Sequence, residues 1–380
     1  MQILLLETTI YGHYLEYIHH LHEGLGRYPE CEMHLVLPPA FKEEREKYDW
    51  MDNARVTISY LSGEELKRVD AGGLLANSWH RAKLLRKYIQ MLKPDAVFLI
   101  SIMSYMPFLP LIVPAKVRVY GILYKLYMYR WKNLSLFRKA FEVIHYYYMT
   151  RAKSINGIFV LNDKSAACFL NRKYSSNKYT YLPDPFNKIA YEGKSLRSEL
   201  GIGESDTVFL HFGAMTDRKG TLEILDAISL LSDDEKYNKV FIFAGVVSDS
   251  IKSQFYHKFK RAETDCRLFL FEGFCTNEKL VDLCVTTDFI LCPYKLTDLS
   301  SGVLGYAATF NKQVIGPAGG LIGKLIRKYR LGITINEVTP ANIAAAISKV
   351  KKSFTESNYV EHIRVDAFVD TIFGKLPSIL

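Results

Sequence analysis

The sequence predicts an α/β fold with two Rossmann-like domains, each built on a parallel sheet. Short apolar runs alternate with amphipathic segments along the chain, as strands do with the helices that connect them. The alternation restarts after a proline-rich segment at 183–193, and 380 residues are enough for two domains of about 100–200 residues each. We therefore place a first domain at 1–188 and a second at 194–356.

Apolar runs bounded by turn residues mark the expected strands. In the first domain these lie at 1–9, 31–39, 96–101, 117–124, 157–163 and 178–186. In the second domain they lie at 207–215, 239–247, 267–274, 289–294 and 313–317. A last helical segment, 357–380, is expected to pack back on the first domain.

Composition indicates a globular cytoplasmic protein. Six cysteines without a CxxC pair favour buried, reduced thiols over a disulfide or zinc framework. The apolar start lacks the basic region and cleavage site of a signal peptide. The uncharged window 96–115 contains three prolines, so a buried strand and a loop are favoured over a membrane span. The net charge of +9 suggests an anionic partner such as a nucleotide diphosphate, anionic lipid or nucleic acid.

The most informative stretch is 293–323, PYKLTDLSSGVLGYAATFNKQVIGPAGGLIG. It predicts a strand end, a Ser-Gly turn, a short helix, a buried strand and a second glycine-rich turn. Ser300 or Ser301 can cap the helix, and Gly302 permits close approach of a ligand. The helix that continues with Val303 has a dipole that favours an anion. The alternative is an ordinary helix cap.

A second candidate for phosphate binding is Gly213–Gly220, GAMTDRKG, between a strand and a helix. Backbone N–H groups at that helix start, together with Arg218 and Lys219, could neutralise a diphosphate. The alternative is a turn with two solvated cations. Its place at the carboxyl end of a strand in a doubly wound sheet favours binding.

Three further positions have both a functional and an ordinary interpretation. Gly319 and Gly320 follow the strand 313–317 and form either a wall of a sugar site or a plain strand–helix turn. Gly12 and His13 follow the first strand, where Gly12 is expected to bind the donor by letting it lie on the backbone. His13 is either a catalytic residue that contacts the sugar, phosphate or acceptor, or incidental. Asp298 either binds sugar hydroxyls or caps its turn.

Residues 124–153 interleave aromatic and basic side chains. One interpretation is a membrane-interface patch on an anionic membrane surface. Its rivals are a nucleic-acid stacking surface and a helix with an aromatic core face and a solvated basic face. The residues concerned are Tyr124, Lys125, Tyr127, Tyr129, Arg130, Trp131, Lys132, Phe137, Arg138, Lys139, Phe141, Arg151 and Lys153.

These motifs resemble those of retaining GT-B glycosyltransferases of family 4, over the whole chain but most specifically in the second domain. The family's G-x-x-x-x-[RE]-K-G motif matches Gly213–Gly220, so its diphosphate-binding lysine corresponds to Lys219. The family's arginine after the first glycine corresponds to Ala214, and Arg218 is the expected substitute.

The family's two-glutamate motif also matches 293–316. Its first glutamate falls on Asp298, and its second, which usually holds the ribose, falls on Tyr306. The Gly-Gly loop after this motif matches Gly319-Gly320, and the glycine-rich first turn matches Gly12-His13. A histidine often found at the exit of the fourth strand is not evident near Tyr124.

The resemblance implies a GT-B fold whose two parallel sheets face an interdomain cleft, with acceptor bound by the first domain and donor by the second. It implies a retaining, hexosyltransferase-type enzyme that moves a sugar from a nucleotide-diphosphate donor to a glycan or lipid-linked acceptor, in polysaccharide or cell-surface glycan biosynthesis. No cofactor, metal or nucleic-acid partner is expected, and the protein would be cytoplasmic, with a peripheral position on the inner face of the membrane. The alternatives are a degenerate GT-B protein that binds a nucleotide or a partner without catalysis, and a nucleotide-sugar epimerase.

Overall fold

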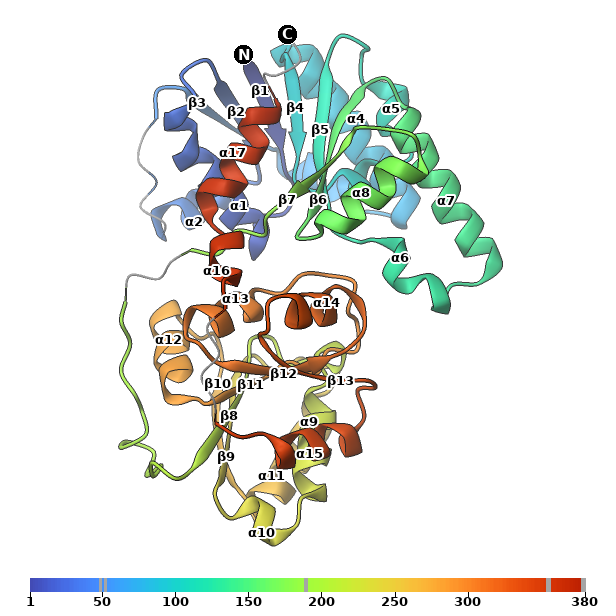
Figure 1. Cartoon of the computed structure of the whole chain (residues 1–380). Coiled ribbons are helices and arrows are strands. Elements are labelled where there is room, and N and C mark those ends of the chain that lie inside the picture. Colours follow the sequence, from blue (N-terminus) through green and yellow to red (C-terminus); the bar gives the residue numbers. More distant parts are fainter. Residues whose placement is uncertain (48–49, 51–52, 188–190, 353–356, 377–380) are drawn as a thin grey trace. The chain divides into compact units, whose positions relative to one another are not determined.

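The computed structural model describes residues 1–47, 50, 53–187, 191–352 and 357–376. The chain divides into two compact units (Figure 1). Unit 1 comprises Met1–Tyr127, Trp131–Pro185 and Arg364–Leu380, and unit 2 comprises Met128–Arg130 and Phe186–Ile363. The last segment returns to unit 1 only at Arg364, because the residues that precede it pack in unit 2.

Unit 1 contains a seven-stranded parallel sheet of order β3-β2-β1-β4-β5-β6-β7. Its central strands are buried along nearly their whole length, which suits apolar runs such as QILLL and AVFL. The strands are β1 (Gln2–Leu6), β2 (Glu32–Leu37), β3 (Val56–Tyr60), β4 (Ala96–Leu99), β5 (Arg118–Leu123), β6 (Ile155–Leu161) and β7 (Tyr179–Leu182).

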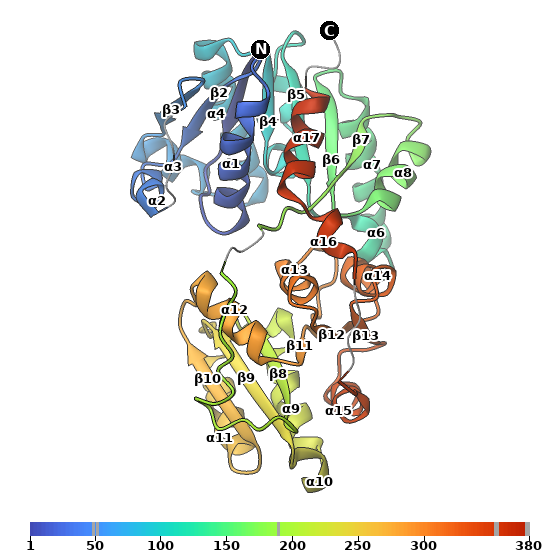
Figure 2. The same cartoon turned by 60° about the vertical axis from the view of Figure 1, so that its left-hand side comes forward.

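The helices of unit 1 connect these strands as crossovers. They are α1 (His13–Gly24), α2 (Phe41–Lys47), α3 (Gly63–Val69), α4 (Leu74–Leu92), α5 (Leu109–Ile112), α7 (Leu136–Arg151), α8 (Lys164–Lys173) and α17 (Val365–Lys375). Helix α6 (Tyr127–Arg130) begins at a residue of unit 1, and its other residues belong to unit 2. Short 3-10 helices are η1 (Leu25–Arg27), η2 (Ile102–Tyr105) and η3 (Trp131–Asn133). Figure 2 shows α17 beside α1, far from it in sequence.

Unit 2 repeats the architecture with a six-stranded parallel sheet of order β10-β9-β8-β11-β12-β13. The strands are β8 (Thr207–Phe212), β9 (Lys239–Gly245), β10 (Arg267–Glu272), β11 (Phe289–Leu291), β12 (Gln313–Pro317) and β13 (Gly332–Ile335). The helices are η4 (Asp217–Lys219), α9 (Thr221–Leu230), α10 (Asp233–Lys236), α11 (Lys252–Glu263), α12 (Asn277–Thr286), α13 (Gly302–Thr309), α14 (Gly320–Lys328), α15 (Pro340–Lys349) and α16 (Tyr359–His362).

The structure adds two strands that the sequence did not predict, β3 and β13. Each forms one edge of its sheet and is only partly buried along most of its length. An edge strand needs fewer apolar residues than a central one, so neither shows the continuous apolar run by which the other strands were predicted.

The second glycine-rich turn of the stretch 293–323 is instead the start of a helix. Gly320 begins α14, and Gly323 lies inside its first turn. At Gly323 a Cβ atom would lie 2.2 Å from the carbonyl oxygen of Ala318. The glycines of this segment therefore allow close packing at a helix start and do not form an open loop.

Both sheets reverse their strand order at one point, between β1 and β4 in unit 1 and between β8 and β11 in unit 2. In open α/β sheets, ligands bind beyond the carboxyl ends of the strands at such a switch point. The turn Gly213–Gly220 follows β8, and the segment 293–302 follows β11, so both candidate phosphate-binding segments lie at the switch point of unit 2.

All six cysteines are free, but only Cys31, Cys284 and Cys292 are buried. The expectation of buried thiols is therefore wrong for Cys168, which is exposed on α8. Among the described residues, no helix combines the length and apolar character needed to cross a membrane.

Candidate functional site

Lys219 is the centre of the candidate site in unit 2. Its Nζ makes one long hydrogen bond, 3.4 Å, to the carbonyl oxygen of Phe212, and lies 5.4 Å from the centre of the Tyr294 ring. Within the described residues it forms no ion pair. Burial lowers the pKa of Lys219 to about 8, and the nearby Arg218 charge acts in the same direction. A partly buried cation that has no anionic partner among the described residues is suited to receive one from a ligand.

Gly213 makes room for this lysine. Its φ of 89° lies in the region that favours glycine, and a Cβ atom there would lie 2.7 Å from Lys219 Nζ. The sequence predicts that Gly213 belongs to a phosphate-binding turn and binds the donor. The structure gives it a local role as well, because the ammonium group occupies the space that a side chain would fill.

Tyr294 lies near the start of the segment 293–302 and contacts side chains of both candidate phosphate-binding segments, although it is not among the site residues predicted from the sequence. The buried ring is 5.7 Å from the Arg218 guanidinium, and its hydroxyl is 3.5 Å from Ser301 Oγ. Tyr294 follows β11 by only a few residues, at the switch point. An aromatic side chain at the carboxyl end of a switch-point strand was the signal that could have identified it.

The start of α13 presents backbone N–H groups at the same edge. Ser301 caps the helix, and its Oγ accepts a hydrogen bond of 3.4 Å from the N–H of Val303. Gly302 is exposed, with open space around its Cα. Ser300 directly precedes this cap. The first-turn N–H groups and the helix dipole together favour an anion here.

Gly319 and Gly320 pack against the loop that carries Asp298. The N–H of Leu321 donates to the carbonyl oxygen of Thr297 at 2.7 Å. A Cβ atom at Gly320 would lie 2.3 Å from that same oxygen, and its φ is 66°. The N-terminus of α14 thus supports the loop that precedes the α13 cap.

Asp298 is buried and already paired in this structure. Its Oδ2 lies 3.2 Å from Nε of Arg130, a residue that also belongs to unit 2. The carboxylate therefore has a cationic partner near the α13 cap, and a sugar hydroxyl would meet an Asp298–Arg130 pair.

Tyr306 occupies the position of the resembled family's second glutamate, and its ring is packed among aromatic side chains. The ring centroid lies 4.9 Å from Phe186 and 5.4 Å from Phe212, in edge-to-face geometry. The hydroxyl donates to Oδ1 of Asn277 at 3.4 Å. A phenol in this setting can offer a ring face and a neutral hydroxyl, but no carboxylate.

His13 lies within an aromatic cluster at the switch point of unit 1. Its ring centroid is 4.5 Å from Tyr14, 5.6 Å from Tyr17 and 5.1 Å from Tyr124. Covering of the imidazole lowers the pKa of His13, although Asp184 opposes this. Gly12 precedes it with a φ of 59°, which glycine accommodates readily.

Two polar features surround this cluster. The Tyr17 hydroxyl donates to Asp184 Oδ1 at 2.5 Å, whereas the buried Tyr124 hydroxyl has no hydrogen-bond partner among the described residues. An unpaired buried hydroxyl is costly, so a bound hydroxyl-bearing molecule would stabilise it. The cluster thus combines ring faces with a carboxylate, which suits a polyhydroxylated ligand.

Glu7, directly after β1, is a buried carboxyl group that the sequence reasoning missed. Its Oε1 accepts hydrogen bonds from the N–H groups of Thr8 and Thr9 at 2.8 and 3.1 Å. Burial raises the pKa of Glu7 to about 7, although these hydrogen bonds oppose the change. A carboxylate at the end of the first strand of a doubly wound sheet was a usable signal.

The aromatic-basic stretch 124–153 does not form a single surface. Tyr127 is buried, Tyr124 and Tyr129 are largely covered, and only part of the aromatic set named from the sequence is exposed. Trp131, Phe137 and Phe141 are exposed. The interpretation of 124–153 as one surface patch that presents all six aromatic residues is therefore wrong. The exposed aromatic residues lie on α7 and on the short helix η3 before it.

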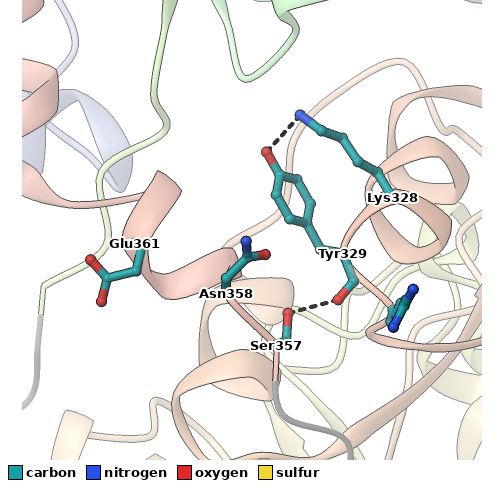
Figure 3. A pocket seen from close by; sticks show the side chains of 6 residues that line it. Lys328, Tyr329, Ser357, Asn358 and Glu361 are labelled. Carbon is teal, nitrogen blue, oxygen red and sulfur yellow. Dashed lines mark hydrogen bonds between the residues drawn. The ribbon is translucent and has the colours of Figure 1, made fainter.

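A separate pocket of about 600 Å³ lies in unit 2 at the far end of α14 (Figure 3). Lys328 Nζ donates to the Tyr329 hydroxyl at 2.8 Å, and Ser357 Oγ donates to the Tyr329 carbonyl oxygen at 2.7 Å. The whole length of α14 separates this pocket from Gly319 and Gly320 at the opposite end. It is therefore distinct from the switch-point site.

Among the described residues, no three His, Cys, Asp or Glu side chains gather as potential metal ligands. No protein-family model matches this sequence, and no curated protein matches it.

Solved structures do resemble the chain. HepE of Anabaena, in complex with UDP, matches over 100% of both chains with a TM-score of 0.70 and 15% identity. WaaG, a glycosyltransferase involved in lipopolysaccharide biosynthesis, matches 98% of this chain and 94% of its own with a TM-score of 0.63 and 14% identity. Sucrose-phosphate synthase from Thermosynechococcus elongatus matches 98% and 94% with a TM-score of 0.67 and 11% identity.

At these identities the likeness establishes the fold. The two parallel sheets and their crossover helices are those of GT-B proteins, so the chain has the GT-B fold with two Rossmann-like domains. The prediction of an α/β chain with two Rossmann-like domains is thereby confirmed.

Proposed function

We propose that this protein is a retaining GT-B glycosyltransferase that transfers a hexosyl group from a nucleotide-diphosphate sugar to a glycan or lipid-linked acceptor. The observation that carries the proposal is Lys219, a partly buried cation that forms no ion pair within the described residues. It lies at the switch point of unit 2, where Arg218 and the α13 start supply further positive potential. A diphosphate matches this arrangement in charge and in place.

In the proposed reaction, unit 2 stabilises the leaving group. Lys219, Arg218 and the N–H groups that follow Ser301 neutralise the diphosphate charge that develops as the bond from the anomeric carbon to the phosphate oxygen breaks. The acceptor hydroxyl attacks the anomeric carbon on the same face, and its proton passes to the leaving phosphate. Retention follows from attack on that face.

The remaining donor contacts are assigned by position. Asp298 and Gly319-Gly320 would face the sugar, and Tyr306 would lie beside the ribose, where its ring and hydroxyl replace a carboxylate. Gly213, Ser300, Gly302 and Val303 would line the diphosphate path. The arrangement needs no metal ion, because Lys219, Arg218 and backbone N–H groups supply the positive charge.

Acceptor binding is assigned to unit 1. Gly12 and His13, with the rings of Tyr14 and Tyr124, supply a stacking surface and an unpaired hydroxyl for a sugar. We place the reaction in cell-surface polysaccharide biosynthesis, with the protein in the cytoplasm and peripheral on the inner face of a membrane.

Thermal-shift measurements with UDP, GDP, ADP and their sugars test donor binding. Because HepE has been solved with UDP and with UDP-glucose, UDP-glucose is the first donor to test. We expect stabilisation by one nucleotide and its sugar, and hydrolysis or transfer of that sugar. Binding without hydrolysis or transfer would favour a degenerate GT-B protein instead.

Lys219→Ala tests the assignment directly. We expect loss of about 2–4 kcal/mol of transition-state stabilisation, seen as a sharp fall in kcat/KM with the protein still folded. Because the Lys219 pKa is about 8, wild-type nucleotide affinity should weaken as pH rises through that value, and the variant should lack this dependence. Lys328→Ala, in the distant pocket, is the matched control. Near-unchanged turnover in Lys219→Ala would refute the assignment.

A further inference from the structure

Helix α7 has one face that holds it to unit 1. Tyr146, Met149 and Thr150 are buried, the Tyr146 hydroxyl donates to the carbonyl oxygen of Lys125 at 2.8 Å, and Thr150 Oγ1 lies 2.6 Å from the Tyr179 hydroxyl. Ser135 caps the helix. These contacts fix the rotation of the helix, so the direction of its opposite face is also fixed.

The opposite face is apolar and exposed. Leu136 is 84% exposed, Phe137 81%, Ile144 66%, Phe141 54% and Tyr147 51%. At about 100° per residue these positions span an arc of about 140°, centred roughly opposite the buried face. Such a row of large apolar residues on one exposed helix face is unusual for a surface that meets only water.

The charge around this face is strongly positive. Between residues 131 and 153, which belong to unit 1 with α7, the sequence has five Lys or Arg residues and one acidic residue, Glu142. Lys132, Arg138, Arg151 and Lys153 are exposed, and Lys139 lies 5.4 Å from the centre of the Trp131 ring. An apolar face bordered by cations matches the acyl and headgroup layers of an anionic bilayer.

We propose that α7 is a membrane-docking helix that lies flat on an anionic bilayer, with Leu136, Phe137, Phe141, Ile144 and Tyr147 inserted among the lipids. This extends the proposed function, on which it rests, because it would bring the enzyme to a lipid-linked acceptor. The charge of the rim favours lipid over a second copy of this chain, since two such rims would repel each other.

Vesicle co-sedimentation tests the proposal without donor or acceptor. Wild-type protein should bind vesicles of phosphatidylcholine with about 30% phosphatidylglycerol, and bind pure phosphatidylcholine more weakly. High salt should weaken the first interaction. Phe137→Glu/Ile144→Glu should lower the partition coefficient by about tenfold or more while the fold and the thermal shift with UDP stay unchanged.

Phe274→Glu/Tyr237→Glu is the matched control, because Phe274 and Tyr237 are 90% and 88% exposed in unit 2 and the two substitutions add the same two negative charges. It should bind vesicles like the wild type. If the Phe137→Glu/Ile144→Glu variant binds vesicles as well as the wild type does, the proposal is overturned. It is also overturned if the wild type is a dimer in solution and that variant is a monomer, because the exposed face of α7 would then bind a second copy of the chain. If the protein binds vesicles but binds no nucleotide, the proposed function is wrong and the assignment of α7 as a membrane-docking helix is still supported.

Discussion

The position of the Lys219 ammonium group depends on Gly213, which lies six residues earlier in the chain. The ammonium group occupies the space above a glycine with positive φ, and burial there lowers the lysine pKa to about 8. The charge that a ligand phosphate would meet is therefore held by backbone geometry. Neither residue alone would make the site.

Glu7 gives a prediction about pH and stability at the same scale. Its pKa rises on folding from 4.5 to about 7 because the carboxyl group is buried. Protonation therefore stabilises the folded state, fully below about pH 4.5, and this contribution is lost as pH rises through 7. The difference corresponds to about 3 kcal/mol.

Glu7→Gln should remove most of that dependence. The amide oxygen can still accept from the Thr8 and Thr9 N–H groups, but the side chain cannot ionise. Urea unfolding between about pH 4.5 and 8 should show a smaller loss of stability in the variant than in the wild type. Glu64→Gln, at an exposed site, should follow the wild type. Parallel curves for all three proteins would contradict the prediction.

At the scale of elements, two helix starts build the candidate site of unit 2. The start of α13 is open around Gly302, whereas the start of α14 is closed against Thr297. The first can meet a ligand, and the second holds the loop that carries Asp298. The sequence shows glycines at both places and does not distinguish these roles.

Gly320→Ala and Gly302→Ala should therefore differ. At Gly320 a Cβ atom meets backbone at 2.3 Å and φ is 66°, so we expect a loss of several kcal/mol in the stability of unit 2. At Gly302 nothing lies within 4 Å, so the fold should be nearly as stable while nucleotide affinity falls. Thermal unfolding and nucleotide titration of both variants separate the effects. Equal melting temperatures would show that the α14 contact does not support the loop.

At the scale of the whole molecule, the chain leaves unit 1 after Pro185 and returns to it at Arg364. Helix α17 then completes the core of unit 1, with Phe368, Val369, Ile372 and Phe373 buried. It lies so close to α1 that a Cβ atom at Gly24 would be 2.3 Å from Val369. Unit 1 therefore depends on residues at both ends of the sequence.

Phe373→Ala should destabilise unit 1 by about 3–5 kcal/mol, because it leaves a cavity where α17 packs into the hydrophobic core of unit 1. Limited proteolysis should then cut within Met1–Pro185 sooner than within unit 2. Phe137→Ala, at an exposed position of α7, is the control and should change stability little. Equal protease sensitivity of Phe373→Ala and the wild type would contradict this role of α17.

Periodicity and turn residues alone predicted the α/β class, the restart of the pattern and most strands, because buried parallel strands must be continuous apolar runs. They also predicted which segments carry the candidate site: Gly213–Gly220 and the Ser-Gly helix start follow strands that the sequence marks clearly. The edge strands β3 and β13 were not predicted, because they are partly exposed and their sequences do not form a continuous apolar run.

Only the tertiary structure brought residues of distant sequence together. It showed that Tyr294 joins Arg218 to Ser301, that Asp298 is paired with Arg130, and that Tyr306 packs on Phe186 and Phe212. It also divided the aromatic-basic stretch into a buried part and the exposed face of α7. The local sequence pattern determines which secondary structure a segment forms. The environment of each side chain depends on packing against segments that are distant in the sequence, such as Arg130 for Asp298.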